Sequence, residues 1–237
     1  MTELSAATRE ALMKVGTSTL SGLLNRRGLR NMFMQEVWPI RPDQPRLVGP
    51  AYTMRFIPSR EDKAGAGPRG PLQRQAMEEC PPGHVLVVDA RGDARAASAG
   101  DLYCGRLKAR GCAGIVTDGG LRDTEGVAKT GLPAYHHRPS SPPSGIVHQP
   151  LDLQVPIGCG GVAVYPGDII VGDCDGIVVI PPDIVDAVAA EALATTLYDE
   201  FAEEEVARGR TLIGLFPVAG DEAKRDFEAW KQARGIK

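Results

Sequence analysis

Two short apolar runs on either side of a helical stretch constrain the fold of this chain most strongly. His84–Asp89 (HVLVVD) and Ala113–Asp118 (AGIVTD) are continuous apolar runs, typical of buried strands. Between them, residues 100–110 (GDLYCGRLKAR) have the pattern of a helix, which Gly111 would end. A strand, a helix and a strand at this spacing predict two parallel strands joined by a right-handed crossover. The middle of the chain is therefore predicted to form an α/β sheet.

Further strands are predicted on both sides of this unit. Residues 47–57 are rich in strand formers, and a third short strand is predicted near Pro133–His137. Residues 155–182 contain short β-rich runs separated by PGD and DCDG turns, which predicts strands and hairpins. Helices are expected over residues 6–28, 72–79, 183–208 and 221–234, and irregular connections over residues 58–71 and 138–150.

The chain shows no internal repeat and no boundary between domains. We therefore predict one domain over residues 1–237, with a core of about residues 8–210 and a C-terminal helical extension over 211–237. Phe227 and Trp230, three residues apart, are expected to dock the last helix on the body of the protein or on a neighbouring subunit.

Composition excludes several classes of protein. The net charge of −3 does not favour a nucleic-acid partner, which usually requires a basic patch. No apolar stretch approaches the length of a membrane span, and the N-terminus does not resemble a secretory signal. The five cysteines form no C-x-x-C pair, so we interpret them as small buried residues with reduced thiols, which suits the cytoplasm.

Polar residues at two loop positions are the strongest candidates for chemistry. Gly100 and Asp101 begin the crossover helix, whose free first-turn amides could bind a carboxylate. Arg122 and Asp123 follow the next strand, and ligands of parallel sheets lie beyond the carboxyl ends of strands. Arg122 could grip a carboxylate, and Asp123 could bind a hard cation such as Mg²⁺. A polar turn with a local ion pair explains the same residues equally simply.

Longer motifs carry a family resemblance. Residues 100–123 (GDLYCGRLKARGCAGIVTDGGLRD) and 155–181 (VPIGCGGVAVYPGDIIVGDCDGIVVIP) strongly resemble the signature regions of the 4-hydroxy-4-methyl-2-oxoglutarate aldolase and RraA-like family. The opening LVGPAYTMRF is similar too, and the match covers roughly residues 8–210. The resemblance implies a three-layer β/β/α fold of the swivelling-domain type and ring-shaped homotrimers, sometimes paired into hexamers.

The resemblance also implies an activity. The aldolases of this family are class II enzymes that use Mg²⁺ or Mn²⁺, cleave 4-hydroxy-4-methyl-2-oxoglutarate or a related 2-keto acid to pyruvate, and decarboxylate oxaloacetate. By position, Asp123 would be the metal ligand, and Asp101 would bind the metal through water. Arg122 would hold the carboxylate or keto oxygen of the substrate. The amides of Leu102 and Tyr103, next to Gly100, would receive the pyruvate carboxylate.

A glutamate from the long helix of a neighbouring subunit completes the site in this family. Counting back from Gly209, Glu200 is the best match, and Glu203, Glu204 and Glu205 lie close enough to compete. The family pattern R-D-x-x-E/D is not kept, because Glu125 stands one place earlier than that acid. This departure leaves the natural substrate and the preferred metal open.

Two other functions remain open at this point. Some members of the family bind ribonuclease E and inhibit it, so the chain could be a protein-binding regulator. Another metal-dependent lyase reaction, on 2-keto acids derived from sugars, would use the same residues. Asp101, Arg122 and Asp123 occur together, which favours an enzyme. A methyltransferase is not favoured, because no Gly-rich methyl-donor loop follows a first strand.

Overall fold

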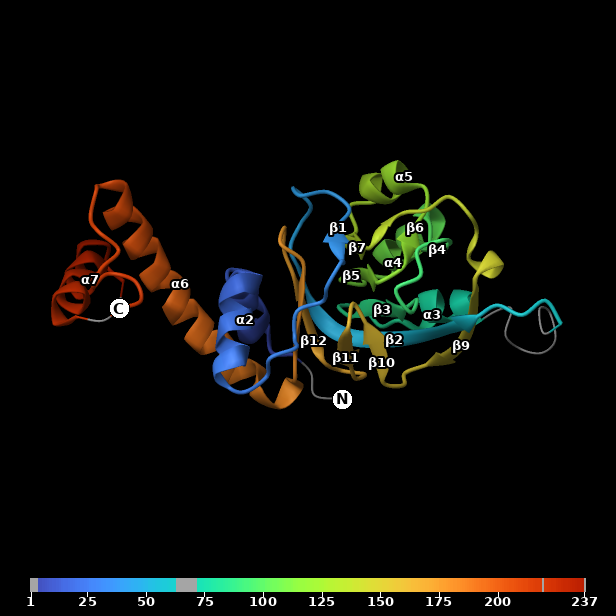
Figure 1. Cartoon of the computed structure of the whole chain (residues 1–237), viewed down its shortest axis with the longest axis horizontal. Helices are drawn as coiled ribbons and strands as arrows, with labels where there is room; N and C mark the ends of the chain where they lie inside the picture. Colours follow the sequence, from blue (N-terminus) through green and yellow to red (C-terminus); the bar gives the residue numbers. More distant parts are fainter. Residues whose placement is uncertain (1–3, 63–71, 219, 237) are drawn as a thin grey trace.

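A large mixed sheet forms the centre of the molecule (Figure 1). The computed structural model describes residues 4–62, 72–218 and 220–236. In the described chain the sheet has eight strands in the order β1-β7-β5-β3-β2-β12-β13, and β9 also pairs with β2. These strands are β1 (Trp38–Pro39), β2 (Leu47–Pro58), β3 (Val85–Asp89), β5 (Gly114–Thr117), β7 (Ala134–His136), β9 (His148–Leu153), β12 (Ile169–Gly172) and β13 (Ile177–Ile180).

The predicted crossover unit is confirmed. Strands β3 and β5 pair in parallel, with Val87 opposite Val116, and α4 (Asp101–Ala109) connects them. Strands β2 and β7 pair in parallel with β3 and β5, respectively, so four neighbouring strands run the same way. Each residue of β3 and β5 is buried, as expected for parallel strands covered on both faces.

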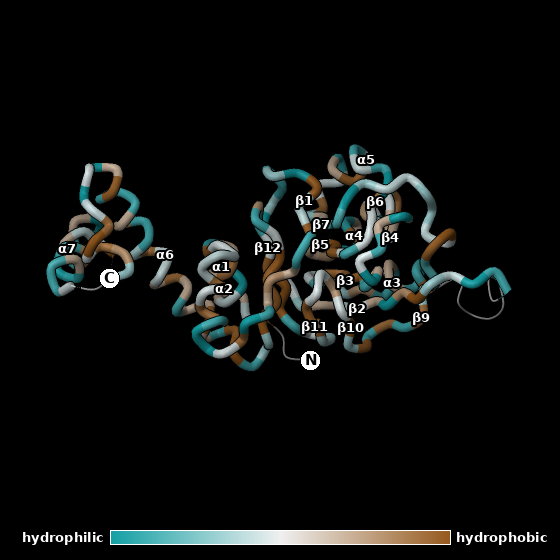
Figure 2. Tube along the Cα trace, in the orientation of Figure 1, coloured by the Kyte–Doolittle hydropathy of each residue, from teal (hydrophilic) through white to brown (hydrophobic). Residues whose placement is uncertain are grey.

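The sheet lies between helices and a second β layer, so the predicted β/β/α layers are confirmed. Helices α3 (Leu72–Glu79), α4 and α5 (Thr124–Lys129) cover one face, over buried side chains that include Leu86 and Ile115. The antiparallel hairpin β10 (Ile157–Cys159) and β11 (Val162–Val164) packs on the opposite side of β3. Figure 2 shows apolar residues concentrated along the strands and polar residues on the outer helices and loops.

A small parallel sheet stands beside the main one and carries the loops with the candidate residues. Its order is β4 (Ala97–Ala99), β6 (Gly120–Leu121) and β8 (Arg138–Pro139). Strand β4 leads directly into α4, and β6 leads into α5. Because β4 and β6 are neighbours, the start of α4 and the start of α5 lie side by side.

The prediction of one helix over residues 6–28 is wrong, because the chain forms α1 (Ala6–Leu12) and α2 (Thr17–Arg26). Gly16 is extended (φ −76°, ψ 150°) just before α2. Asp173, which follows β12, accepts hydrogen bonds from the amide and the hydroxyl of Thr17, both at 2.8 Å. A carboxylate distant in sequence therefore caps α2, and helical periodicity alone could not indicate this break.

The segment 138–150 is more regular than predicted. It contains β8, a 3₁₀ turn at Ser144–Ile146 and the beginning of β9. The Ala97 amide donates to the Pro142 carbonyl at 2.9 Å, so backbone pairing with neighbouring strands imposes order on this segment. Part of the other predicted connection, residues 63–71, lies outside the described residues.

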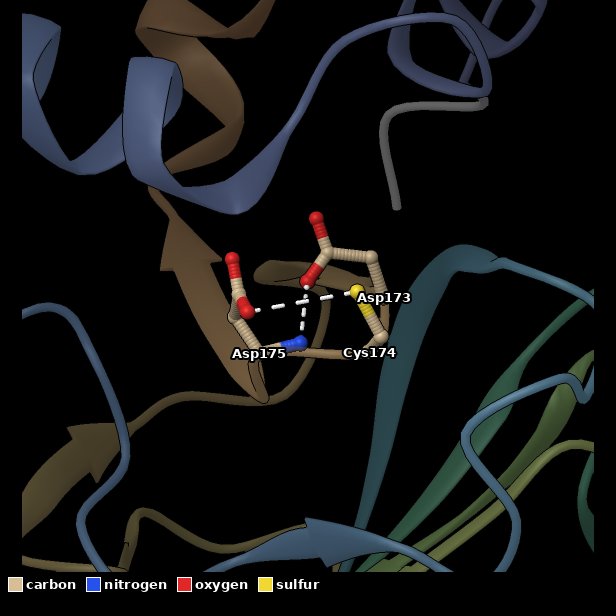
Figure 3. A group of neighbouring side chains, drawn as sticks. All are labelled: Asp173, Cys174 and Asp175. Atoms are coloured by element: carbon tan, nitrogen blue, oxygen red, sulfur yellow. Dashed lines mark hydrogen bonds between the residues drawn. The ribbon is translucent and has the colours of Figure 1, made fainter.

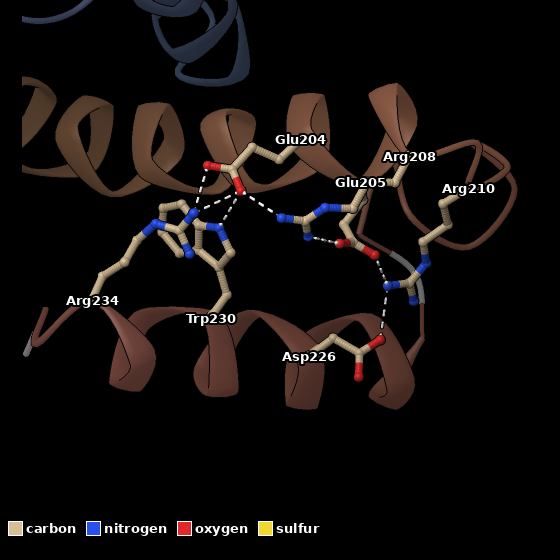
Figure 4. Close-up of polar contacts among 7 residues, drawn as sticks. All are labelled: Glu204, Glu205, Arg208, Arg210, Asp226, Trp230 and Arg234. Atoms are coloured by element: carbon tan, nitrogen blue, oxygen red, sulfur yellow. Dashed lines mark hydrogen bonds and ion pairs between the residues drawn. The ribbon is translucent and has the colours of Figure 1, made fainter.

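The C-terminal extension packs on its own chain. Helix α7 (Asp221–Ala233) folds back on the long helix α6 (Val185–Ala207), where Phe227 and Trp230 join Tyr198 and Phe201 in an aromatic cluster. Trp230 also donates its indole N–H to Glu204 at 3.0 Å (Figure 4). The last helix therefore docks on α6 of its own chain.

The expected burial of the cysteines is confirmed at four positions, and Cys174 is exposed. Burial raises the pKa of the Cys104 thiol to about 12, so it remains protonated and acts as a small apolar group. Across the part of the chain that the structure describes, no helix has both the length and the apolar character that crossing a membrane requires.

Trp230→Ala is expected to release α7 from α6 without unfolding the central sheet. Trp230 is 92% buried in contacts within the α6–α7 pair, and replacing such a side chain by alanine costs about 3–5 kcal/mol. Hydrogen exchange should accelerate over residues 221–233 and remain slow over β3. The exposed Gln232→Ala on the same helix is the control. Unchanged exchange in α7 would show that other contacts hold this helix.

Candidate functional site

The candidate residues lie together in one pocket of about 420 Å³. Its walls come from the start of α4, from the β6–α5 connection, from α3 and from the loop before β9. The lining residues are Gln73, Ala97, Ala99, Gly100, Asp101, Leu102, Tyr103, Arg122, Asp123, Pro143, Ser144 and Gly145. All six residues that the sequence singled out within one chain line this pocket: Gly100, Arg122 and Asp123 come from two connections, and Asp101, Leu102 and Tyr103 form the first turn of α4.

The first turn of α4 supplies backbone amides to this pocket. Gly100 precedes the helix in an extended conformation, and no side chain caps the helix. The Leu102 amide donates to Oδ1 of Asp101 at 2.7 Å, so it is engaged by its neighbour's carboxylate. The first intrahelical bond is that of Cys104 to the Gly100 carbonyl, so the Tyr103 amide has no helical partner. Tyr103 thus offers the more available amide of the two.

Arg122 and Asp123 are held against the start of α4 by strand pairing. The Arg122 amide donates to the Ala99 carbonyl at 3.0 Å. The Nε of Arg122 lies 2.9 Å from Oδ2 of Asp123, in an ion pair whose side chains are 44% and 43% exposed. Such exposed pairs contribute roughly 0–1 kcal/mol to stability. Asp123 also takes a left-handed conformation (φ 53°, ψ 41°), which is uncommon outside glycine.

Two glycines allow these loops to approach so closely. A Cβ at Gly100 would lie 2.9 Å from both Cγ of Arg122 and Oδ2 of Asp123. A Cβ at Gly126 would lie 2.9 Å from Cβ and from Oδ2 of Asp101. Gly126 occupies the position at which the family pattern has an acid, so Asp101 packs into space that a side chain would fill. The displaced acid, Glu125, instead pairs with Lys129 at 2.6 Å on the surface.

The carboxylates of the pocket fit a hard divalent cation. Asp101 and Asp123 both line the pocket. Among described donors, only Arg122 engages the Asp123 carboxylate, through Oδ2, which leaves Oδ1 for another ligand. Carboxylate oxygens are the ligands that Mg²⁺ prefers, and this ion commonly keeps several waters. Two carboxylates with access to water therefore suit it.

Glu200 does not join these residues within one chain. It is exposed on α6, which extends away from the body that carries α4 and α5 (Figure 1). Two of its competitors are engaged elsewhere, because Glu204 and Glu205 form ion pairs with arginines of the α6–α7 hairpin (Figure 4). Glu200 has no hydrogen bond or ion pair to any described residue.

The loops after Asp89 and Asp118 also meet, at the carboxyl ends of the parallel strands β3 and β5. Asp118 accepts hydrogen bonds from the amides of Ala90 and Gly92 at 2.7 and 2.9 Å. Burial raises the pKa of Asp118 above its usual value, and these amides oppose that effect. Since the carboxylate is used to join two loops, we assign Asp118 a structural role.

A second acidic group stands at the turn between β12 and β13 (Figure 3). Asp173, Cys174 and Asp175 place possible ligand atoms within 4.8 Å of one another. Both carboxylate oxygens of Asp173 already accept hydrogen bonds from Thr17, and one also accepts from the Asp175 amide at 3.0 Å. The group is thus explained by a turn that caps α2.

The sequence did not single out two polar residues of the pocket. Gln73 lies in α3, and Ser144 begins a 3₁₀ turn in the segment predicted to be irregular. No motif indicates either residue, because their positions depend on how α3 and the loop before β9 pack beside β4.

The fold and the pocket define a class of α/β protein in which a helix start, an arginine and two carboxylates converge beside parallel strands. A family model described as Aldolase/RraA matches residues 17–179. A protein of Halalkalibacterium halodurans, provisionally named a 4-hydroxy-4-methyl-2-oxoglutarate aldolase, is 34% identical over 195 residues, which are 81% of this chain and 85% of that protein. The chain belongs to the Aldolase/RraA family.

Solved structures share the fold. The Streptomyces coelicolor protein RraAS2, described as an unusual member of the RNase ES inhibitor RraA protein family, is 30% identical with a TM-score of 0.76, over 86% of this chain and 98% of that one. An uncharacterised protein from Pseudomonas syringae pv. tomato is 24% identical with a TM-score of 0.78, over 91% and 99% of the two chains. The second likeness supports the fold alone.

Gly100→Ala is expected to weaken Mn²⁺ binding at the pocket by at least about tenfold, because the added methyl group displaces the Asp123 carboxylate. Titration followed by electron paramagnetic resonance measures this change. Gly158→Ala in β10 is the control, since a Cβ there meets nothing within 4 Å. Equal Mn²⁺ affinity in both variants would mean that the close approach at Gly100 is unimportant for the cation.

Proposed function

We propose that this protein is a divalent-metal-dependent lyase of class II. It would cleave a 4-hydroxy-2-keto acid, such as 4-hydroxy-4-methyl-2-oxoglutarate, to pyruvate and a second carbonyl compound, and it would decarboxylate oxaloacetate. The observation that carries this proposal is the convergence of Asp101, Arg122 and Asp123 with the first turn of α4 in one pocket. The named relative supports the same activity.

Each of these groups has a role that suits a 2-keto acid. The free amide of Tyr103 would bind the carboxylate of the pyruvate portion, at a helix end that favours an anion. Arg122 would lie against the keto oxygen and stabilise the negative charge that develops there. Asp123, with Asp101 acting through water, would hold Mg²⁺ or Mn²⁺. The bound ion would supply Lewis-acid stabilisation of the same charge.

The reaction breaks the bond between C3 and C4 of the substrate. The C4 hydroxyl loses its proton and becomes a carbonyl, while the electron pair of the broken bond leaves pyruvate as an enolate. A proton then adds to C3 to give pyruvate. Carboxylates beside the pocket are the groups that could move these protons. Since Arg122 and a bound cation would stabilise this charge, the proposed reaction requires no lysine Schiff base.

The pocket would be completed by a second copy of the chain. Leu102 at its rim is 85% exposed, which is unusual for a large apolar side chain beside a ligand site. Glu200 projects on α6 with no partner among the described residues. We therefore assign Glu200 of the partner subunit as the acid that faces the pocket in a homotrimer or hexamer.

The second candidate function is binding to ribonuclease E. The likeness to RraAS2 favours it, because that protein is described as a member of an RNase inhibitor family. Binding a macromolecule would not require the small pocket or its carboxylates, so the geometry supports the lyase better. Binding of ribonuclease E without any metal-dependent turnover would reverse this preference.

Pyruvate release from oxaloacetate and from 4-hydroxy-4-methyl-2-oxoglutarate should depend on Mg²⁺ or Mn²⁺ and stop when a chelator is added. Asp123→Asn should lower kcat/KM at least about 100-fold, because it removes the charged oxygen that holds the cation. Glu125→Gln is the matched control, since this neighbouring acid points to the surface and pairs with Lys129. Full activity of folded Asp123→Asn would remove the assigned metal ligand.

Sites shared between subunits should be restored by mixing two inactive variants. Asp123→Asn and Glu200→Gln, coexpressed in equal amounts, should form mixed oligomers in which about a quarter of the sites contain both native residues. Activity should reach that share of the wild-type value. If the mixture stays as inactive as each variant although both assemble, Glu200 does not act across the interface.

A further inference from the structure

Two of the cysteines meet in the folded chain, apart from the residues that line the pocket. Cys80 follows the end of α3, and Cys112 lies between α4 and β5. They are 32 positions apart in the sequence, yet the Cys112 thiol donates to the Cys80 carbonyl, with 3.4 Å between sulfur and oxygen. The two thiols also hydrogen-bond to each other. The proposed lyase reaction uses neither residue.

Backbone hydrogen bonds on both sides of Cys112 hold it in this position. The Gly83 amide donates to the Gly111 carbonyl at 2.8 Å, and the Ala113 amide donates to the His84 carbonyl at 2.7 Å. Because these bonds flank Cys112, its side chain is fixed beside the segment that follows α3. The contact between the two sulfurs is therefore a property of the folded core.

The two thiols differ in exposure and in acidity. Cys112 keeps 6% of its surface exposed, whereas Cys80 is fully buried. The hydrogen bond from Cys80 and the positive charge of Arg110 lower the pKa of Cys112, although burial opposes them. The hydrogen bond to Cys112 and burial raise the pKa of Cys80. Since the thiolate is the nucleophilic form of cysteine, Cys112 is the group that reacts first.

From this geometry we propose that Cys80 and Cys112 are a redox-active pair, which forms a reversible disulfide when the protein meets a peroxide. The bond ties the end of α3 to the segment that leads into β5. Disulfides of cytosolic proteins are usually transient ones of this kind. The proposal concerns a second site and does not depend on the lyase function.

The reaction takes place in two steps. The Cys112 thiolate attacks one oxygen of hydrogen peroxide, so an S–O bond forms and the O–O bond breaks. The other oxygen leaves as hydroxide, which takes up a proton to become water, and Cys112 is now a sulfenic acid. The Cys80 sulfur then attacks the Cys112 sulfur, the S–O bond breaks, and water leaves with the Cys80 proton. Two thiols thereby lose two electrons in total, and the peroxide is reduced to two waters.

Treatment of the folded, reduced, full-length protein with hydrogen peroxide tests this proposal. Tryptic cleavage places Cys80 in the peptide of residues 75–91 and Cys112 in the peptide of residues 111–122. After the remaining thiols are blocked and the protein is digested without reductant, we expect these two peptides to be joined. Their mass should be two hydrogens below the sum of the separate peptides, and dithiothreitol should separate them.

Three other measurements serve as controls. Cys174 is exposed, so its oxidation reports that the peroxide has reacted with the protein, and the peroxide concentration is raised until it does. Cys104→Ala is the matched variant, because Cys104 is buried in the same apolar cluster, and it should form the joined peptides as fully as the wild type. Cys112→Ala should form none. Circular dichroism of each oxidised sample checks that the protein is still folded.

The proposal is overturned if Cys174 is oxidised while Cys80 and Cys112 are both recovered as free thiols from folded protein. Conversion of Cys112 to the sulfinic acid with Cys80 unchanged would also contradict it, because Cys80 would then not react with the sulfenic acid. The same holds if the joined peptides appear only after the protein has been unfolded. Joined peptides from folded wild type and from Cys104→Ala support the proposal.

Discussion

The close approach at Gly100 is the constraint on which the candidate site depends. The pairing of β4 with β6 brings the Arg122 backbone to the Ala99 carbonyl. Only a residue without Cβ then leaves room for the Arg122 and Asp123 side chains to cross the start of α4. The helix end, the guanidinium and the carboxylate thereby share one small volume. Gly126 repeats the arrangement on the other side, where Asp101 fills the space of a missing side chain.

The sequence predicts the part of this arrangement that follows from local pattern. Buried parallel strands are continuous apolar runs, so β3, β5 and the crossover helix could be recognised, and with them the edge at which Arg122 and Asp123 lie. The resemblance added the layers of the fold. Interactions between distant segments could not be recognised. The cap of α2 by Asp173 breaks a helix that periodicity predicts as continuous, and backbone pairing orders the Pro- and Ser-rich loop.

The same limit explains which pocket residues were found. Arg122 and Asp123 belong to a motif, so their joint placement could be predicted. Gln73 and Ser144 belong to none, and they reach the pocket only because α3 and the loop before β9 pack beside β4. In this account the motif supplies the reactive groups, while the tertiary packing of less distinctive segments completes the walls of the pocket.

The long helix α6 adds a constraint of another kind. It carries Glu200, which has no partner among the described residues, away from the body. Trp230 of α7 and Arg234 engage Glu204, while Arg208 and Arg210 form ion pairs with Glu205 (Figure 4). The hairpin thus leaves Glu200 available to another copy and occupies two of the three neighbouring acids that could replace it, while Glu203 stays exposed. The rim of the pocket, with Leu102 exposed, is the surface that such a copy would cover.

Exchange of the methyl hydrogens of pyruvate in D₂O, followed by proton NMR, tests the central claim most directly. Exchange requires the enzyme to form and protonate the enolate of pyruvate, the intermediate on which the proposed reactions converge. The account predicts exchange that requires Mg²⁺ or Mn²⁺, stops with chelator and is lost in Asp123→Asn. Folded protein that binds the metal and leaves the methyl hydrogens unexchanged would contradict it.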